Sequence, residues 1–371
     1  MEYNPMEELG LREERQFITA NRGVLSANEY ARDLCGKYVR NGTKLFDIIK
    51  RYERISSFLL SRRVETPSST MQFILPFLKA GGVTDFDAYM FAKEDMILMP
   101  GAKETMGYLN SLLPSFISSS TFDHDMRAVC EALDFPVANA TCSMTEFDSI
   151  ELDRDEAKRI RDMAVEITKL KIPDRRYSFE GGEVLSKEDT DILVLLDRLF
   201  TEELPDMKIY QAVNSMRAIG ANEKSYSVLE IRRKTSIDFD STMYVGTDIY
   251  DHMAMDIIKE SDGLALSFNG NEFAVRASNV AVVGDDTTVI ALLAAEFYDY
   301  GIEAVYDLIE DWSPKALRDH ICSDNNIRDE LLRRYPKKLP EVRKVDKSNV
   351  DEVSSVSESY RKKLRNRFRK Y

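Results

Sequence analysis

The sequence predicts an α/β fold with a mainly parallel sheet covered by helices. Short apolar runs alternate along the chain with segments in which apolar residues recur every three or four positions, which is the pattern of strands alternating with helices. Small or polar residues follow several of these runs, and we expect them to converge because ligands bind outside the carboxyl ends of parallel strands. The predicted strands are Gln16–Thr19, Ser115–Ile117, Met243–Val245, Leu264–Phe268 and Val280–Val283.

Composition and charge exclude several classes of protein. The 371 residues are 43% apolar and 10% aromatic, which is enough for a hydrophobic core and excludes a disordered or fibrous chain. The formal net charge of −13 argues against a protein that coats nucleic acid. No apolar stretch is long enough for a membrane span, and the first residues lack the layout of a signal peptide, so we expect a cytoplasmic protein. The four cysteines form no CxxC pair, so the sequence indicates neither a disulfide framework nor a zinc site.

Two helical segments interrupt the predicted core. Residues 26–95 and 151–204 show helical periodicity, and we interpret both as insertions. From residue 336 onward the composition becomes polar, and we interpret 336–371 as a tail with a basic end. The core then comprises residues 1–25, 96–150 and 205–315.

Three polar clusters that follow predicted strands or open helices supply candidate binding residues. Ser118 and Ser119 stand between a predicted strand and a helix, where hydroxyl and amide groups bind phosphate; an ordinary helix-capping loop is the alternative. Lys224 opens a predicted helix and either adds positive charge to a phosphate site or is solvated. Asp248 and Asp251 offer oxygen ligands for Mg²⁺, although Asp251 also suits the first turn of a helix.

The order of these clusters resembles the motifs of the haloacid dehalogenase-like (HAD) superfamily of phosphohydrolases. More narrowly, the chain resembles an archaeal branch of that superfamily labelled energy-converting hydrogenase A subunit R. The resemblance implies a Rossmann-like core with helical cap insertions, in which Ser118 and Lys224 match the positions that bind phosphate. It covers roughly residues 15–312 and rests on Gly23–Ser26, Met71–Ala80, Met99–Ala102, Ile117–Ser120, Met243–Gly246 and Ser267–Asn271.

The first motif departs from the pattern of the family. HAD enzymes carry two acidic residues before the glycine of the first loop, one as nucleophile and one as general acid and base. Counted from Gly23, these positions hold Ala20 and Arg22, and neither side chain can perform that chemistry. We expect Arg22 to replace the metal and to pair with Asp248 or Asp251, so the expected cofactor is none, or Mg²⁺ bound weakly by these two carboxylates.

We therefore expect a catalytically degenerate, phosphatase-like protein that binds a phosphorylated ligand or a protein partner without hydrolysis. One alternative is an active Mg²⁺-dependent phosphohydrolase that uses displaced carboxylates such as Asp238, Asp248 or Asp251. The string Asp238–Thr242 matches the first HAD motif, but the segment before it is basic and poorly apolar, which favours a surface loop. The other alternative is an accessory subunit of a membrane-bound hydrogenase complex, which follows from the resemblance and the basic end.

The last eleven residues, Arg361–Tyr371, contain seven basic and no acidic side chains. Leu364 and Phe368 would share one face of a helix. A basic amphipathic helix at an anionic membrane surface or a protein partner is one expectation, and a solvated end is the other. The first would place a cytoplasmic protein at the membrane periphery. We expect no nucleic-acid partner, since one basic segment on an acidic chain is only local evidence.

Overall fold

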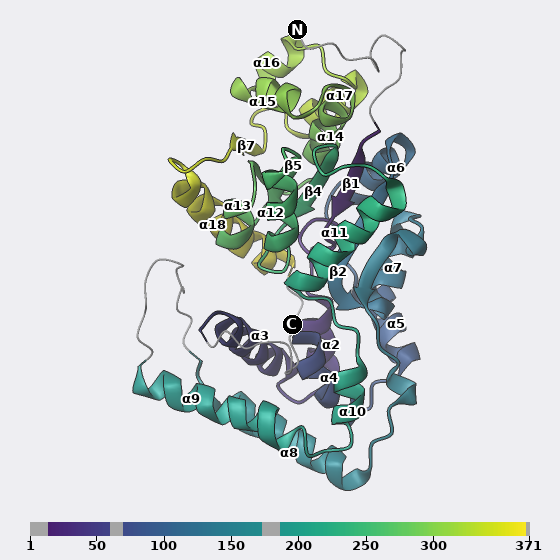
Figure 1. Cartoon of the computed structure of the whole chain (residues 1–371), viewed down its shortest axis with the longest axis vertical. Helices are drawn as coiled ribbons and strands as arrows, with labels where there is room; N and C mark the ends of the chain where they lie inside the picture. The colour runs from purple at the N-terminus through teal and green to yellow at the C-terminus, as the bar shows by residue number, and fades with distance from the viewer. Residues whose placement is uncertain (1–13, 60–69, 173–185, 369–371) are drawn as a thin grey trace.

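The computed structural model describes residues 14–59, 70–172 and 186–368, and its centre is a seven-stranded sheet flanked by helices (Figure 1). The strand order is β3-β2-β1-β4-β5-β6-β7. Strands β1 to β6 pair in parallel, and β7 runs antiparallel to β6. The prediction of an α/β fold with a mainly parallel sheet is confirmed.

The four central strands are fully buried, whereas the two edge strands are partly exposed. A central parallel strand is covered on both faces and therefore appears in the sequence as a continuous apolar run. The edge strands β3 and β7 have the sequences ATCS and EVRK, which contain no such run, and the sequence analysis does not predict them. The strands are β1 Gln16–Thr19, β2 Ser115–Phe122, β3 Ala140–Ser143, β4 Thr242–Gly246, β5 Leu264–Phe268, β6 Val280–Val283 and β7 Glu341–Lys344.

Helices cover both faces of the sheet. Phe17 and Ile18, adjacent in β1, point to opposite faces and join two separate hydrophobic clusters. The first cluster includes residues of α6, α7 and α14, and the second includes residues of α11 and α12. The helices that follow strands of the sheet or extend it are α6 Ala102–Leu112, α7 Asp123–Leu133, α11 Ala221–Thr235, α12 His252–Glu260, α13 Glu272–Arg276, α14 Thr288–Tyr300, α15 Ile302–Glu310, α16 Pro314–Asp319, α17 Asn325–Arg334 and α18 Val350–Phe368, with short 3₁₀ turns at Val137–Asn139 and Phe147–Ser149.

The helices of residues 26–95 and 151–204 pack against one another. They share one large hydrophobic cluster that is separate from the clusters of the sheet, and Figure 1 shows them gathered below the sheet. Aromatic rings fill its centre: the ring centroid of Phe200 lies 4.6 Å from that of Phe73 and 5.3 Å from that of Tyr52. These helices are α2 Tyr30–Tyr38, α3 Gly42–Leu59, α4 Thr70–Ala80, α5 Asp85–Asp95, α8 Arg154–Lys169, α9 Lys187–Arg198 and a π-helical turn at Leu199–Glu203. The next helix, α10 Tyr210–Ser215, lies beyond the second segment and joins the same cluster through Val213.

The interpretation of 336–371 as a tail is wrong over the part of this segment that the structure describes. Strand β7 completes the sheet, and α18 packs against α13 and β6. The hydroxyl of Ser357 donates to the carbonyl of Gly270 at 2.8 Å, and Arg361 is only 8% exposed. A polar average composition is misleading here because α18 docks through a mixed face, in which Val353, Ser354, Ser357 and Arg361 are buried. Residues 369–371 of the predicted basic end lie outside the described residues.

Within the three described stretches, no helix is both long enough and apolar enough to cross a membrane.

We expect Phe200→Ala to lower the free energy of unfolding by about 3 to 5 kcal/mol, because it leaves a cavity among packed aromatic rings. Urea unfolding followed by circular dichroism measures this loss. Phe86→Ala is the matched control, since Phe86 is 69% exposed whereas Phe200 is fully buried, and we expect it to change stability by about 0.5 kcal/mol or less. Equal losses for the two variants would contradict the assignment of Phe200 to the centre of the helical cluster.

Candidate functional site

The carboxyl ends of β1 and β4 bring the first loop, which contains Ala20 and Arg22, against the acidic loop that contains Asp248 and Asp251. The N–H of Ala20, one residue past β1, donates to the carbonyl of Val245 in β4 at 2.8 Å. The hydroxyl of Thr247 in turn donates to the carbonyl of Arg22 at 3.0 Å. These two bonds follow from the parallel register of β1 and β4, and they hold the two loops together. The predicted convergence of the two loops is confirmed.

Arg22 pairs with Asp248, as the sequence predicts. Its guanidinium group hydrogen-bonds to the carboxylate of Asp248 and to that of Glu29, the latter at 2.5 Å. Burial acts to raise the pKa of Asp248, but Arg22 and Arg361 together hold it well below its usual range. Burial alone would likewise raise the pKa of Glu29, yet Arg22 and Lys50 lower it to about 2. Both acids are therefore ionised and paired near neutral pH.

A second guanidinium group reaches the same carboxylate from α18. Arg361 donates to the backbone carbonyls of Thr247 and Asn269, the latter at 3.2 Å, and lies 3.5 Å from Asp248 Oδ2. Sequence reasoning missed this residue because it lies 113 positions from Asp248, in a segment interpreted as a tail. No local signal identifies it; only the docking of α18 brings it to the site.

Lys224 and Asp251 form a buried ion pair beneath this cluster, with Nζ and Oδ1 separated by 2.5 Å. Asp251 also accepts the hydroxyl of Tyr244 at 3.1 Å and the N–H groups of Thr247 and Asp248 at 2.8 and 3.1 Å. Every oxygen of Asp251 therefore already has at least two donors, and the charge of Lys224 is balanced by protein.

These residues do not fit a magnesium ion. Mg²⁺ requires oxygen ligands in near-octahedral geometry. Asp248 is flanked by two guanidinium groups, and the oxygens of Asp251 are taken by four hydrogen bonds. A dication about 4 Å from Arg22 would be opposed by roughly 8 kcal/mol at an effective dielectric constant of 20. The arrangement thus has guanidinium groups where the resemblance to HAD enzymes places a metal.

Ser118 and Ser119 lie inside a strand rather than between a strand and a helix. Strand β2 continues to Phe122, and both serines are buried within it. The hydroxyl of Ser119 accepts the N–H of Thr121 at 3.2 Å. The expectation that the strand ends at Ser118 is therefore wrong, because a run of small hydroxyl residues, Ser118–Thr121, continues the parallel strand to Phe122. Phosphate binding by Ser118, Ser119 and Lys224 stays a prediction.

Helices α3 and α4 close the mouth of the cleft. Glu53 accepts the hydroxyl of Tyr250 at 2.6 Å and that of Thr70 at 3.4 Å. Burial raises the pKa of Glu53 to about 7, whereas burial and Arg22 lower the pKa of Lys50 to about 8. The cavity left between these helices and the strand ends measures about 10 Å³, which is room for one water molecule.

Positive charge exceeds negative charge around the mouth of this cleft. Besides the buried Lys224–Asp251 ion pair, which has no net charge, and the buried Asp125, which interacts with Glu29, the groups that influence one another there include three acidic residues, Glu29, Glu53 and Asp248, and five basic residues, Arg22, Lys50, Arg54, Arg361 and Arg365. We call these eight residues the cleft cluster. Even with all three acids ionised, the cleft cluster carries two more positive than negative charges, so it is suited to an anion.

Asp238 and Asp240 lie away from the cleft. Both are exposed and precede β4, so they stand at its amino end, opposite the loops that carry Arg22 and Asp248. Asp238 is paired with Arg232 at 2.5 Å. The interpretation of this string as a surface loop is confirmed.

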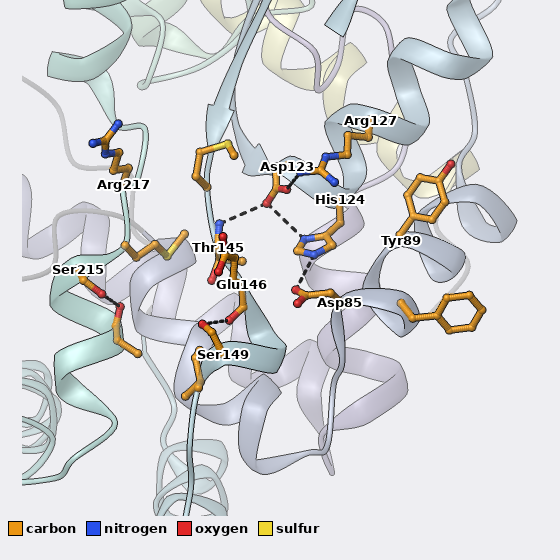
Figure 2. Close-up of a pocket in the computed structure, with 15 residues that line it drawn as sticks. Asp85, Tyr89, Asp123, His124, Arg127, Thr145, Glu146, Ser149, Ser215 and Arg217 are labelled. Carbon is orange, nitrogen blue, oxygen red and sulfur yellow. Dashed lines mark hydrogen bonds and ion pairs between the residues drawn. The ribbon is translucent and has the colours of Figure 1, made fainter. Parts of the chain in front are cut away.

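A larger cavity of about 650 Å³ lies beside β2 and β3, and sequence reasoning missed it (Figure 2). Its lining comes from α5, α7, the segment after β3 and α10, which are far apart in the sequence. On its wall His124 Nε2 lies 2.8 Å from Asp85 Oδ1, and His124 Nδ1 lies 3.4 Å from Asp123 Oδ1. Asp85 also accepts the N–H of Phe147 at 2.7 Å, so these contacts tie α5 to α7 and to the segment after β3.

We expect Glu53→Gln to flatten the dependence of stability on pH between about 4.5 and 7. The pKa of Glu53 is raised from 4.5 to about 7, so in this range the folded state holds a proton that the unfolded chain has released. The contribution of Glu53 to the free energy of unfolding therefore falls by about 3 kcal/mol as the pH rises through this range. Glutamine does not titrate, so the variant lacks this contribution. Urea unfolding at several pH values measures the slope. The exposed Asp240→Asn is the control, and an unchanged slope in Glu53→Gln would refute the assignment.

Comparison with known proteins shows a shared fold. No protein-family model and no curated protein matches the sequence. The chain is similar to the structure of gene product AF1437 from Archaeoglobus fulgidus, with 21% identity over 95% of this chain and 97% of that chain and a TM-score of 0.76. A weaker likeness is to phosphoserine phosphatase in its apo form, with 11% identity over 75% of this chain and 98% of that chain and a TM-score of 0.46. Another is to a HAD family hydrolase from Salmonella enterica serovar Typhi, with 9% identity over 70% of this chain and 64% of that chain and a TM-score of 0.42. The first likeness establishes the fold over almost the whole chain and says nothing of activity.

Proposed function

We propose that this chain is a catalytically degenerate HAD-like protein that binds a phosphorylated small molecule at the cleft cluster without hydrolysing it. The observation that carries the proposal is the excess of positive charge at a strand-end cleft whose first loop holds Ala20, and no carboxylate, at the nucleophile position. The parallel sheet, the two helical insertions and the resemblance of the loops support the ancestry. The positive charge of the cleft cluster and the substitution of Ala20 and Arg22 in the first loop support the binding of a phosphorylated ligand without its hydrolysis.

The reacting groups of a HAD phosphohydrolase are missing from the first loop. Ala20 is buried at the nucleophile position, and its methyl group forms no phosphoryl ester. Arg22, at the acid and base position, is fixed between Glu29 and Asp248 and stays protonated. Loss of a covalent nucleophile costs about 10⁶ in rate in a well-studied hydrolase, so residual turnover here would be negligible.

The basic residues of the cleft cluster suit a phosphate group. Guanidinium groups bind phosphate oxygens in bidentate fashion, and ammonium groups add a compact charge. Arg54 and Arg365 are exposed at the mouth, and Lys50 is partly exposed. Because the enclosed space admits only one water molecule, we place the phosphate at the mouth, against these three residues. Lys224 and Ser118 lie too deep to reach it without a movement of α3 and α4.

The other hypotheses gain no support from particular residues. An active phosphohydrolase would need a free carboxylate near Ala20, but Asp248 and Asp251 are both held in ion pairs. The buried Asp125 accepts hydrogen bonds from Asn21 and Thr121 at 3.3 and 2.8 Å, so it is also engaged by the protein. A role as an accessory subunit of a hydrogenase complex stays a prediction from the resemblance, as does binding to a membrane or protein through the basic end.

We expect inorganic pyrophosphate to bind the wild-type protein and to bind Lys50→Met/Arg365→Gln at least tenfold more weakly. Each charge-assisted hydrogen bond contributes about 1.5 to 3 kcal/mol, and this variant removes two donors. It breaks the ion pair between Lys50 and Glu29 but leaves the Arg22–Asp248 and Lys224–Asp251 pairs intact. Isothermal titration calorimetry at low salt measures the affinity. Lys103→Met is the matched control, because Lys103, which lies on α6, forms an exposed ion pair with Asp134 at the end of α7. Equal affinities for the three proteins would overturn the proposed site.

We expect the wild-type protein to show no Mg²⁺-dependent hydrolysis of phosphate esters. The double variant Ala20→Asp/Arg22→Glu restores the two acids of the first motif, but Arg361 still stands against Asp248. We therefore expect Mg²⁺ to raise the melting temperature only when Arg361→Met is added to that variant, and hydrolysis to appear with the metal. Turnover of p-nitrophenyl phosphate by the wild type, lost in Asp248→Asn, would show that the protein is an active hydrolase.

A further inference from the structure

A buried carboxylate lies inside the most apolar helix of the sheet domain. Glu296 belongs to α14, is only 2% exposed, and stands between the buried residues Ala295 and Phe297. Its carboxylate accepts the N–H of Ser323 at 2.7 Å and the thiol of Cys322. A carboxylate can accept about four hydrogen bonds, and burying its charge is costly without a cation. No ion pair with Lys or Arg is found for Glu296 among the residues that the structure describes.

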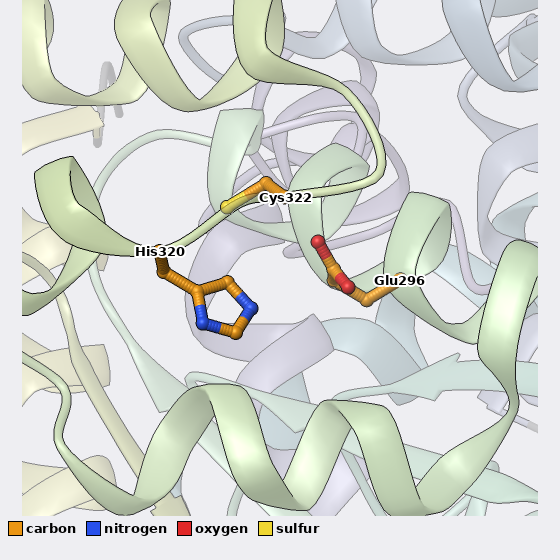
Figure 3. A group of neighbouring side chains, drawn as sticks. All are labelled: Glu296, His320 and Cys322. Atoms are coloured by element: carbon orange, nitrogen blue, oxygen red, sulfur yellow. The ribbon is translucent and has the colours of Figure 1, made fainter.

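Two further metal-binding side chains face Glu296 from the segment between α16 and α17 (Figure 3). His320 has extended backbone dihedrals, φ −82° and ψ 135°, and side chains two positions apart on an extended segment point the same way. Ile321, between His320 and Cys322, is 86% exposed and points outward. The ligand atoms of Glu296, His320 and Cys322 all lie within 4.8 Å of one another.

We propose that Glu296, His320 and Cys322 bind one divalent transition-metal ion of the Zn²⁺ class. Carboxylate, imidazole and thiolate are all ligands of zinc in proteins. On binding, the sulfur–metal bond forms as Cys322 releases its proton to solvent. One carboxylate and one thiolate then neutralise the dication, so the buried site carries no net charge. Three protein ligands leave a fourth position for water.

The geometry requires only a small closure of the three side chains. Zinc–ligand bonds of about 2.0 to 2.3 Å place tetrahedral ligands about 3.5 Å apart, so the present separations of at most 4.8 Å must shrink by about 1.3 Å at most. His320 is partly exposed, which gives the metal access from solvent. The neighbouring guanidinium group of Arg328 is paired with Asp329 at 2.8 Å, so its charge is balanced. The metal would link α14 to the α16–α17 connection.

Cobalt binding tests this site, because Co²⁺ takes the place of Zn²⁺ and its thiolate complex absorbs light. We expect the full chain, stripped of metal, to bind about one Co²⁺ with a sulfur-to-cobalt absorption band that Zn²⁺ abolishes. We expect Cys322→Ser to lose the band and His320→Gln to weaken the affinity at least tenfold. The matched controls are Cys142→Ser and His252→Gln, which alter a partly buried thiol and a partly buried imidazole outside the cluster.

Retention of the band in Cys322→Ser, or its loss in Cys142→Ser, would overturn the proposal. Absence of Co²⁺ uptake by the wild type would do the same. If Cys322→Ser fails to fold, His320→Gln decides the question, since its side chain lies at the edge of the cluster and the change conserves polarity. An increase in melting temperature with Zn²⁺ that is present in the wild type and both controls, and absent from His320→Gln, supports the site without reference to any activity.

Discussion

Two guanidinium groups on one buried carboxylate determine what the strand-end cleft can do. Arg22 comes from the first loop of the sheet and Arg361 from the last helix, and both contact Asp248. Each guanidinium group presents donors in a fixed plane, so the pair holds the two loops and α18 in one arrangement. The same contacts oppose a divalent cation at this carboxylate, whose other oxygen accepts the N–H of Tyr250 at 3.1 Å.

The C-terminal helix is therefore part of the site as well as part of the fold. Strand β7 and α18 close the edge of the sheet, and in doing so they carry Arg361 to the carbonyls of Thr247 and Asn269. Burying a charge of this kind is costly unless it is paired and hydrogen-bonded, and here both conditions hold. Stability of the C-terminal segment and the electrostatics of the cleft are thus coupled through one side chain.

Local charge in the cleft differs from the charge of the chain as a whole. The protein carries a formal net charge of −13, whereas the cleft cluster carries a surplus of positive charge. Attraction between an anion and this cleft acts over roughly 10 Å at moderate salt, beyond which ions screen it. A phosphate-bearing ligand would therefore be drawn to the mouth of the cleft and away from most of the remaining surface. The same field opposes a metal ion at Asp248.

The central sheet was predictable from the sequence, because a parallel strand buried on both faces is a continuous apolar run. Strands β1, β4, β5 and β6 show this pattern, and their order with the intervening helices places Ala20, Arg22 and Asp248 at one edge. The pairing of Arg22 with Asp248 was predictable for a chemical reason: an arginine beside a buried acid neutralises it. The edge strands β3 and β7 were not predictable, since they are only partly buried and their residues show no apolar run.

Only the tertiary structure decided which distant residues complete each site. Arg361 reaches Asp248 across 113 positions, and Glu296 meets His320 and Cys322 across the two helices α15 and α16. Neither contact has a spacing that local periodicity could reveal. The polar average of residues 336–371 indicated a tail because composition does not show that α18 docks through a face on which Val353, Ser354, Ser357 and Arg361 are buried. Local sequence determines strands, helices and the chemistry of each side chain. Which side chains meet depends on packing between segments far apart in the chain.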